Sequence, residues 1–214
     1  MNKTKNETRM EKKEKQFYLP KNKPELINIP KFKFFTIEGK GNPNDDFFAE
    51  NIGVLYSLSY GVKMNSKKGI EPKGFFDYTV YPLEGIWEIS KEAKLSFNGA
   101  INKNDLIFKL MIRQPDFVDK DVALQFLEQT KKKKPHDLLG KVKFEEITEG
   151  NCIQMLHFGS YDYEPESFRI MEKFADTNNY KRKTMTHREI YLSDARKVSP
   201  DKLRTVLRYR IEKR

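Results

Sequence analysis

The chain has 214 residues, of which 41 are Lys or Arg and 31 are Asp or Glu, so its formal net charge is +10. Hydrophobic residues make up 37% of the chain and aromatic residues 13%, which is enough apolar material for a packed core and excludes wholesale disorder. The single cysteine, Cys152, excludes an internal disulfide and lies in a strand-like stretch where a small buried side chain is expected. The N-terminus holds no apolar signal-peptide core and no run of 18 apolar residues occurs, so we expect a cytoplasmic protein without a membrane partner.

Residues 1–29 are predicted to form a basic N-terminal arm ahead of a domain that spans residues 30–214. The sequence up to residue 16 is almost wholly polar or charged, and residues 4–15 fit a frayed surface helix. Pro20, Pro24 and Pro30 then favour an extended or irregular path, because proline fixes one backbone torsion and lacks an amide hydrogen.

The domain is predicted to begin with a strand at residues 31–38, which are rich in strand formers. A glycine-rich turn follows, and Asp45 and Asp46 open a helix whose apolar face recurs every three to four residues up to Val62. In chain order, the remaining predicted elements are a loop at 69–74, strands at 75–81 and 106–113 on either side of the Trp87 segment at 83–89, a helix at 119–134, a linker at 136–142, a strand at 153–158, a turn at 159–162, a helix at 165–178 and strands at 184–192 and 203–211.

The order strand, helix, strand, strand therefore occurs twice, with an inserted helix between the two occurrences. The two stretches also share local texture: residues 36–41 correspond to 156–161, and residues 79–84 to 189–194. We therefore predict an α+β fold of two strand–helix–strand–strand units side by side. Its antiparallel sheet would carry helices on one face and a central ligand cleft on the other.

The stretch around Glu189 carries the main functional signal. Side chains alternate along a strand, so Ile190 and Leu192 are expected on one face, packed against helices, with Glu189 and Tyr191 on the other. A carboxylate among aromatic rings is costly to bury without a partner, so it is either solvated at an edge or kept for a ligand.

Five segments together resemble the GyrI-like small-molecule-binding family. They are EGKGNPN at 38–44, YPLEGIW at 81–87, HFGSYD at 157–162, HREIYLSD at 187–194 and LRTVLRY at 203–209. The resemblance runs from about residue 30 to the C-terminus and implies paired units around a central cleft. Ser160 departs from the family pattern, since many relatives have proline there, which affects only the expected turn.

The resemblance implies that Glu189 faces the cleft as the characteristic acidic residue of the family. In regulator members that residue engages the charged end of flat, often cationic, drugs. In some stand-alone members the acidic residues of the cleft are implicated in hydrolysing cyclopropane-containing electrophiles. The residues predicted to line the cleft are Glu189, Tyr191, Tyr81, Trp87, Met111, Tyr161 and Phe35, with Glu84 as a candidate second catalytic carboxylate beside Glu189.

The sequence leaves two small-molecule functions open. In the first, the cleft captures a hydrophobic, aromatic or cationic molecule, with a role in drug resistance, because ring faces attract cations and the carboxylate adds a directional contact. In the second, Glu189 and Glu84 activate water for the hydrolysis of a strained electrophile. We expect no cofactor and no metal, since no dinucleotide, P-loop, nucleophile-elbow or metal-ligand spacing occurs. The sequence leaves monomer and homodimer open.

A nucleic-acid partner is the third alternative, and it rests on charge alone. Net +10 and short basic runs permit salt-sensitive attraction to phosphate, but no DNA-binding motif is present. The run from Lys131 to Lys134 ends a predicted helix, where cations complement the helix dipole. We therefore expect no specific nucleic acid partner. His157 and His187 are expected to be packed or hydrogen-bonded strand residues.

Overall fold

The computed structural model describes residues 14–66, 71–95 and 102–214. Most of the helix predicted at residues 4–15 lies outside the described residues, as do residues 69 and 70 of the predicted loop. The chain forms two compact units. Unit 1 contains residues 32–83 and 89–147; unit 2 contains residues 84–88 and 148–214 together with the described part of 11–31. Each unit therefore combines segments that are far apart in the sequence.

Unit 1 is built on an antiparallel strand pair. Strand β1 (Glu25–Lys40) pairs through residues 33–40 with β3 (Leu106–Gln114), so that Phe35 lies opposite Ile112 and Thr36 opposite Met111. Both predicted strands are confirmed, and β1 begins earlier than expected.

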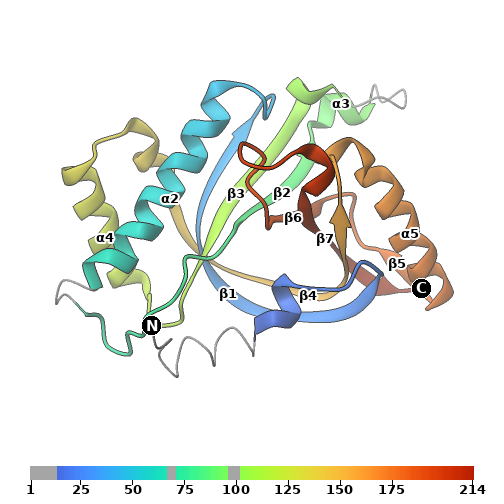
Figure 1. Ribbon diagram of the computed structural model, residues 1–214, viewed down its shortest axis with the longest axis horizontal. Coiled ribbons are helices and arrows are strands. Elements are labelled where there is room, and N and C mark those ends of the chain that lie inside the picture. Colours follow the sequence, from blue (N-terminus) through green and yellow to red (C-terminus); the bar gives the residue numbers. More distant parts are fainter. Residues whose placement is uncertain (1–13, 67–70, 96–101) are drawn as a thin grey trace. The chain divides into compact units, whose positions relative to one another are not determined.

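Two helices of unit 1 lie side by side, and the longer one also contacts β3 (Figure 1). Helix α2 (Asp46–Ser66) covers the face of β3 that carries Phe108, whose ring lies 5.1 Å from that of Phe48. Helix α4 (Lys120–Lys133) begins after Asp119, whose carboxylate accepts a hydrogen bond from the Val122 amide at 2.9 Å. Both predicted helices are confirmed.

The strand predicted at residues 75–81 is wrong. These residues have no regular secondary structure, and the strand is β2 (Leu83–Ile89), which begins after Pro82. The aromatic residues that suggested a strand pack on Phe117 instead: the rings of Phe75 and Phe76 each lie 5.3 Å from it, and that of Tyr78 lies 5.8 Å away. Shorter elements also replace irregular stretches, namely α3 (Lys91–Leu95), η1 (Lys103–Asp105) and η2 (Asp137–Lys141).

Unit 2 is built around strand β7 (Arg204–Lys213). Antiparallel to it run β4 (Lys143–Phe158), through residues 152–158, and β6 (His187–Tyr191). Residues 84–87 of β2 pair with β6, and the short β5 (Tyr180–Arg182), which was not predicted, pairs with the end of β7. The remaining elements are η3 (Tyr161–Tyr163), helix α5 (Glu164–Thr177) and η4 (Pro200–Lys202).

Helix α5 packs on the face of the unit 2 sheet that carries Glu189. The core there contains Met155 and Leu207 of the strands and Met171 of the helix, and Leu207 lies directly opposite Glu189 in the register. The expectation that the Ile190 face would receive the helix is therefore wrong, although the predicted alternation itself is confirmed. The opposite face carries Cys152, which is fully buried as predicted, and burial raises the pKa of its thiol to about 12.

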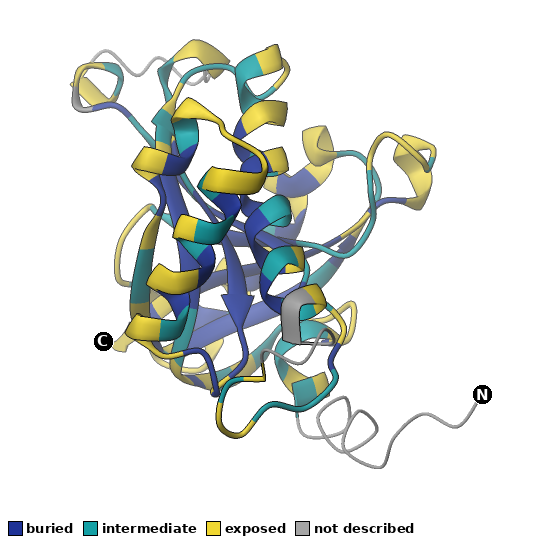
Figure 2. Cartoon of the chain, turned by 90° about the vertical axis from the view of Figure 1, so that its left-hand side faces the viewer, coloured by how far each residue is buried: buried dark blue, intermediate teal, exposed yellow. Residues whose placement is uncertain are grey.

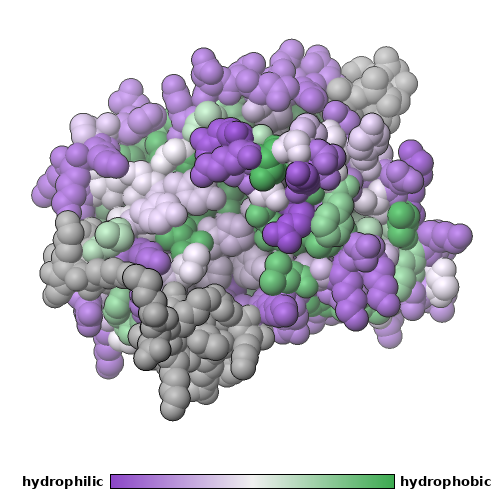
Figure 3. Space-filling model, viewed as in Figure 1, coloured by the Kyte–Doolittle hydropathy of each residue, from purple (hydrophilic) through white to green (hydrophobic). Residues whose placement is uncertain are grey.

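The burial pattern agrees with an α+β protein whose strands form the core. In Figure 2 the strands are largely buried, while the helices are buried on one side and exposed on the other. The predicted α+β class with an antiparallel sheet is confirmed. Figure 3 shows hydrophilic side chains over much of the visible face, with smaller hydrophobic patches between them. Among the described residues, no helix is both long enough and apolar enough to cross a bilayer.

Candidate functional site

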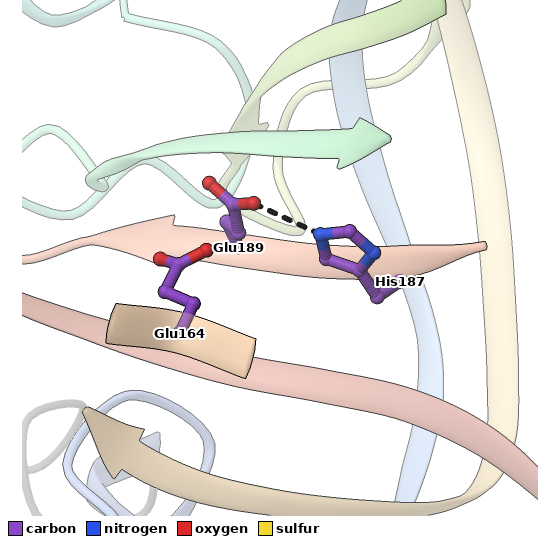
Figure 4. Close-up of side chains that lie close together, drawn as sticks. All are labelled: Glu164, His187 and Glu189. Carbon is purple, nitrogen blue, oxygen red and sulfur yellow. Dashed lines mark hydrogen bonds and ion pairs between the residues drawn. The ribbon is translucent and has the colours of Figure 1, made fainter. Parts of the chain in front are cut away.

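Two glutamates from different elements of unit 2 meet on the helix-covered face of the sheet. Glu189 is the middle residue of β6, and Glu164 is the first residue of α5 (Figure 4). Gly159, with φ of +112°, provides the turn between β4 and η3 in a conformation that favours glycine. Both glutamates are buried, with exposed fractions of 7% for Glu164 and 8% for Glu189. The site therefore contains a buried pair of carboxyl groups, which we call the Glu164–Glu189 pair.

The two oxygens of Glu189 have separate hydrogen-bond partners on its own strand. Oε1 lies 2.9 Å from Nε2 of His187, and Oε2 accepts from the Tyr191 hydroxyl at 2.7 Å. Because residues two apart on a strand point to the same face, all three side chains belong to one surface of β6. In the part of the chain that the structure describes, no lysine or arginine forms an ion pair with either member of the Glu164–Glu189 pair.

A hydrogen-bond chain continues from Tyr191 to Trp87 of β2. The indole Nε1 donates to the Tyr191 hydroxyl at 2.8 Å, and Tyr191 donates onward to Glu189. Gly85 lies directly opposite Glu189 in the register and makes this arrangement possible. A Cβ at position 85 would lie 2.9 Å from Trp87 Nε1 and 3.2 Å from the Tyr191 hydroxyl. Glycine therefore leaves the space in which the two rings meet.

The protonation states follow from burial and from the neighbouring charge. Burial raises the pKa of Glu164 well above its ordinary value, and the charge of the neighbouring Glu189 raises it further. Glu164 is therefore the member of the pair that holds a proton most readily. Burial and the Glu189 charge also raise the pKa of Tyr191 well above its ordinary value, so its hydroxyl remains a donor. Burial, followed by the charge of Glu189, raises the pKa of Tyr161 to about 12.

Aromatic rings surround the Glu164–Glu189 pair. Tyr161 meets Tyr191 edge to face at 6.0 Å, and the Phe168 ring of α5 lies 4.8 Å from the His187 ring. Tyr161 has 37% of its surface exposed and the His187 side chain 22%. These two residues are the more accessible members of the site, whereas Trp87 is buried.

Glu84 lies on the other face of the unit 2 sheet and does not meet Glu189. It pairs in register with Ile190, so its side chain points away from that of Glu189. Its carboxylate accepts from Arg188 at 2.6 Å and from the Tyr18 hydroxyl at 3.2 Å. The hypothesis that Glu84 and Glu189 share one water is therefore wrong, and the second carboxyl of the site is Glu164.

Glu84 belongs to a buried ionic network on that opposite face. Arg188 also pairs with Glu149 at 3.1 Å, and Glu149 pairs with Arg208 at 3.0 Å. Each carboxylate of the network thus has a guanidinium partner. Arg208 donates as well to Gln154 at 2.9 Å and to the backbone oxygen of Phe17 at 2.5 Å. Residues of the predicted N-terminal arm therefore take part in this network.

The remaining predicted ligand-binding residues belong to unit 1. Phe35 is buried on the face of the β1–β3 pair that α2 covers, 5.5 Å from the ring of Phe144. Met111 is also buried but points to the opposite face of the same strands. The Tyr81 ring lies 4.7 Å from the Arg113 guanidinium. Of the predicted set, the structure brings together Glu189, Tyr191, Trp87 and Tyr161, and it places Phe35 and Met111 on different faces.

Sequence reasoning missed Glu164, His187 and Gly85 as parts of the site. Glu164 looks like an ordinary acid in the first turn of a helix, where the dipole favours negative charge, and nothing in the sequence relates it to Glu189. Glu164, His187 and Glu189 each offer a ligand atom within 4.8 Å of the others, a spacing that could also admit a metal ion. Sequence spacing did not predict this set, because its members come from a helix and a strand.

A groove elsewhere on unit 2 is separate from the Glu164–Glu189 pair. It has a volume of about 350 Å³ and lies beside β4 and α5, where Phe158, Tyr163 and Ile170 are exposed. His157 and Ser167 also line it, whereas Glu164 and Glu189 do not. Its volume suits a small molecule, but its chemistry differs from that of the carboxyl pair.

Comparison with known proteins relates the chain to one family. The profile of the GyrI-like small molecule binding domain matches residues 22–212. A hydrolase from Listeria innocua is 34% identical, with 95% of this chain and 98% of that chain covered and a TM-score of 0.84. A hydrolase encoded by lin2189 from Listeria innocua is 35% identical over the same shares, with a TM-score of 0.85. The EcmrR C-terminal domain shares the fold at 12% identity, with 90% of this chain and 98% of that chain covered and a TM-score of 0.55. Among curated protein sequences, none matches significantly.

Proposed function

The chain belongs to the GyrI-like family of small-molecule-binding domains, and we propose that it captures a hydrophobic, aromatic or cationic molecule over the Glu164–Glu189 pair and hydrolyses it. The observation that carries this proposal is the buried carboxyl pair, whose oxygens lie within 4.8 Å of one another. Two carboxyls whose environments separate their protonation states supply an acid and a base at the same place. The two Listeria innocua proteins described as hydrolases support turnover in addition to binding.

The proposed chemistry uses the two carboxyls in different roles. Glu189, ionised, accepts a proton from a water molecule as the water oxygen bonds to a strained electrophilic carbon of the ligand. The ring carbon–carbon bond breaks, and its electron pair passes to the electron-withdrawing group of the ligand, which takes the proton of Glu164. Water has then added across the broken bond, and one proton remains on the pair. Glu189 holds this proton, and its transfer to Glu164 restores the starting state.

The surrounding side chains would hold the base and receive the ligand. Tyr191 and His187 each bond one oxygen of Glu189, which fixes the carboxylate plane. The rings of Tyr161 and Tyr191 offer faces that attract an aromatic or cationic ligand, each contact being worth roughly 0.5–2 kcal/mol. We propose xenobiotic detoxification as the biological role, with cyclopropane-type electrophiles as the substrate class.

The test measures turnover and binding separately. The protein is incubated with a cyclopropane-bearing alkylator in excess, with and without a chelator, and ring-opened product is counted per protein molecule. We expect several turnovers, a loss of about 100-fold or more in kcat for Glu189→Gln and for Glu164→Gln, and no loss for Glu166→Gln, an exposed acid in the same helical turn. The absence of ring-opened product would argue against hydrolysis.

A binding measurement then tests capture alone. Fluorescence titration with a planar cationic dye is expected to give weaker binding for Glu189→Gln, because the ionised carboxylate of the site is lost. Unchanged affinity would mean that the ligand does not bind over the Glu164–Glu189 pair. If binding depends on Glu189 but no ring-opened product forms, the function is capture alone.

A further inference from the structure

His157 is a buried histidine of β4 whose two ring nitrogens have different partners. Nε2 lies 3.1 Å from the backbone oxygen of Ser160, and Nδ1 lies 2.9 Å from Oγ of Ser167. A carbonyl oxygen can only accept, so Nε2 carries the hydrogen and donates it. In the neutral ring Nδ1 is then an acceptor, and the Ser167 hydroxyl donates to it.

The two serines enclose the segment that brings two side chains to the site. Ser160 precedes η3, and Ser167 lies in the first turn of α5. Between them are Tyr161, which meets the Tyr191 ring, and Glu164, whose carboxyl lies within 4.8 Å of that of Glu189. A single ring on the sheet therefore holds both ends of the segment of residues 160–167.

We infer that His157 is a positioning residue, which holds the segment of residues 160–167 so that Glu164 meets Glu189. This inference rests on the proposed function, because it assigns His157 an effect on the chemistry of the Glu164–Glu189 pair without contact with the ligand. Glu164 lies between Ser160 and Ser167, so the two hydrogen bonds of the His157 ring, which we call the His157 clamp, hold the backbone on both sides of it. A shift of about 1 Å in a reacting group can lower a rate 100-fold, so the clamp has a measurable consequence.

The charged and titratable groups around Glu164 define a direct readout of its position. They are Glu189, Tyr191 and His187 on β6, together with Asp162 on the segment itself. Of these, Glu189 has the largest effect on the pKa of Glu164, through its charge. If Glu164 moves away from β6, its carboxyl loses this neighbour and its pKa falls toward the ordinary value.

The experiment combines carbon-13 NMR titration of the glutamate carboxyls with kinetics on the cyclopropane-bearing alkylator. His157→Leu removes both hydrogen bonds, His157→Gln retains the donor toward Ser160, and Ser167→Ala removes only the bond to Nδ1. We expect kcat to fall by about tenfold to 100-fold in His157→Leu, with smaller losses in His157→Gln and Ser167→Ala. The pKa of Glu164 should fall in the same order. Matched controls are His136→Gln and Ser199→Ala, which change exposed residues and should leave both readouts unchanged.

Two results would overturn the inference. One is a folded His157→Leu variant, or a folded Ser167→Ala variant if the former does not fold, with the wild-type pKa of Glu164 and the wild-type kcat. The other is a covalent fluorophosphonate adduct on Ser167, which would give the Ser–His pair a nucleophilic role instead. If the wild-type protein shows no turnover, the proposed function fails, whereas the titration still tests the clamp.

Discussion

The two faces of the unit 2 sheet each bury two glutamates, but the partners of these glutamates differ between the faces. On one face, Glu84 and Glu149 are neutralised by Arg188 and Arg208 at distances of 2.6–3.1 Å. On the other, Glu189 is hydrogen-bonded to His187 and Tyr191, and Glu164 lies beside it. Burial alone therefore does not identify a functional acid.

The difference lies in the compensating charge. A buried carboxylate with a guanidinium partner stays ionised and has no reason to exchange protons, so we interpret the Arg188 face as structural. Two buried carboxyls without such a partner cannot both ionise, so one holds a proton that it can give up. Arg188 and Glu189 are neighbours on β6 and point to opposite faces of the sheet. The ionic network and the Glu164–Glu189 pair therefore lie on opposite sides of the same strand.

The largest effect on stability is expected from removing an arginine of the buried ionic network. Arg188→Met leaves Glu84 buried without its guanidinium and should lower the free energy of unfolding by about 3–5 kcal/mol, as measured in urea. Adding Glu84→Gln should recover part of the loss, because the orphaned charge is removed. Arg196→Met is the matched control: its ion pair with Asp194 is largely exposed, so the change should stay within about 0.5 kcal/mol. A loss equal to that of the control would contradict the structural role.

A smaller effect is expected from crowding the carboxyl face. Gly85→Ala places a methyl group 2.9 Å from Trp87 Nε1 and should destabilise by about 1–3 kcal/mol while separating the indole from Tyr191. Tryptophan fluorescence and urea unfolding measure the two consequences. Gly53→Ala is the control, because a Cβ at this position in α2 meets nothing within 4 Å, and it should stabilise by about 0.5–1 kcal/mol. If both variants changed the free energy of unfolding in the same direction, the close approach at Gly85 would be disproved.

The smallest effect concerns Glu164 and the pH dependence of the free energy of unfolding. The pKa of Glu164 is raised from its ordinary 4.5, so the folded state keeps a proton that the unfolded state releases above that pH. This contribution is complete below pH 4.5 and is lost as pH rises through the folded-state pKa. Glutamine cannot ionise, so the free energy of unfolding of Glu164→Gln should not fall in this pH range. Relative to the wild type the variant should therefore become more stable as pH rises, as measured by thermal or urea unfolding. For the exposed control Glu166→Gln, we expect no change relative to the wild type as pH rises. If Glu164→Gln instead became less stable than the wild type with rising pH, the Glu164 carboxyl would be ionised in the folded state.

Much of the fold could be predicted because it depends on local patterns. The apolar stripe of α2, the acid that caps α4 and the apolar run of β3 are short-range features, and all three elements are present. The strand predicted at 75–81 was wrong because the same aromatic residues favour both strands and aromatic clusters. Only the position of Phe117, about 40 residues along the chain, decides between them.

The sequence by itself determined that Glu189 and Tyr191 share one face of a strand, because the period of two is a property of the extended backbone. The resemblance to the GyrI-like family added the importance of that glutamate. Only the tertiary structure decided which carboxyl meets it. The sequence predicts Glu84 as the partner, but the register of β2 against β6 turns Glu84 to the other face, and the path of α5 brings Glu164 instead. Register and helix placement are set by packing between distant segments, which no local pattern encodes.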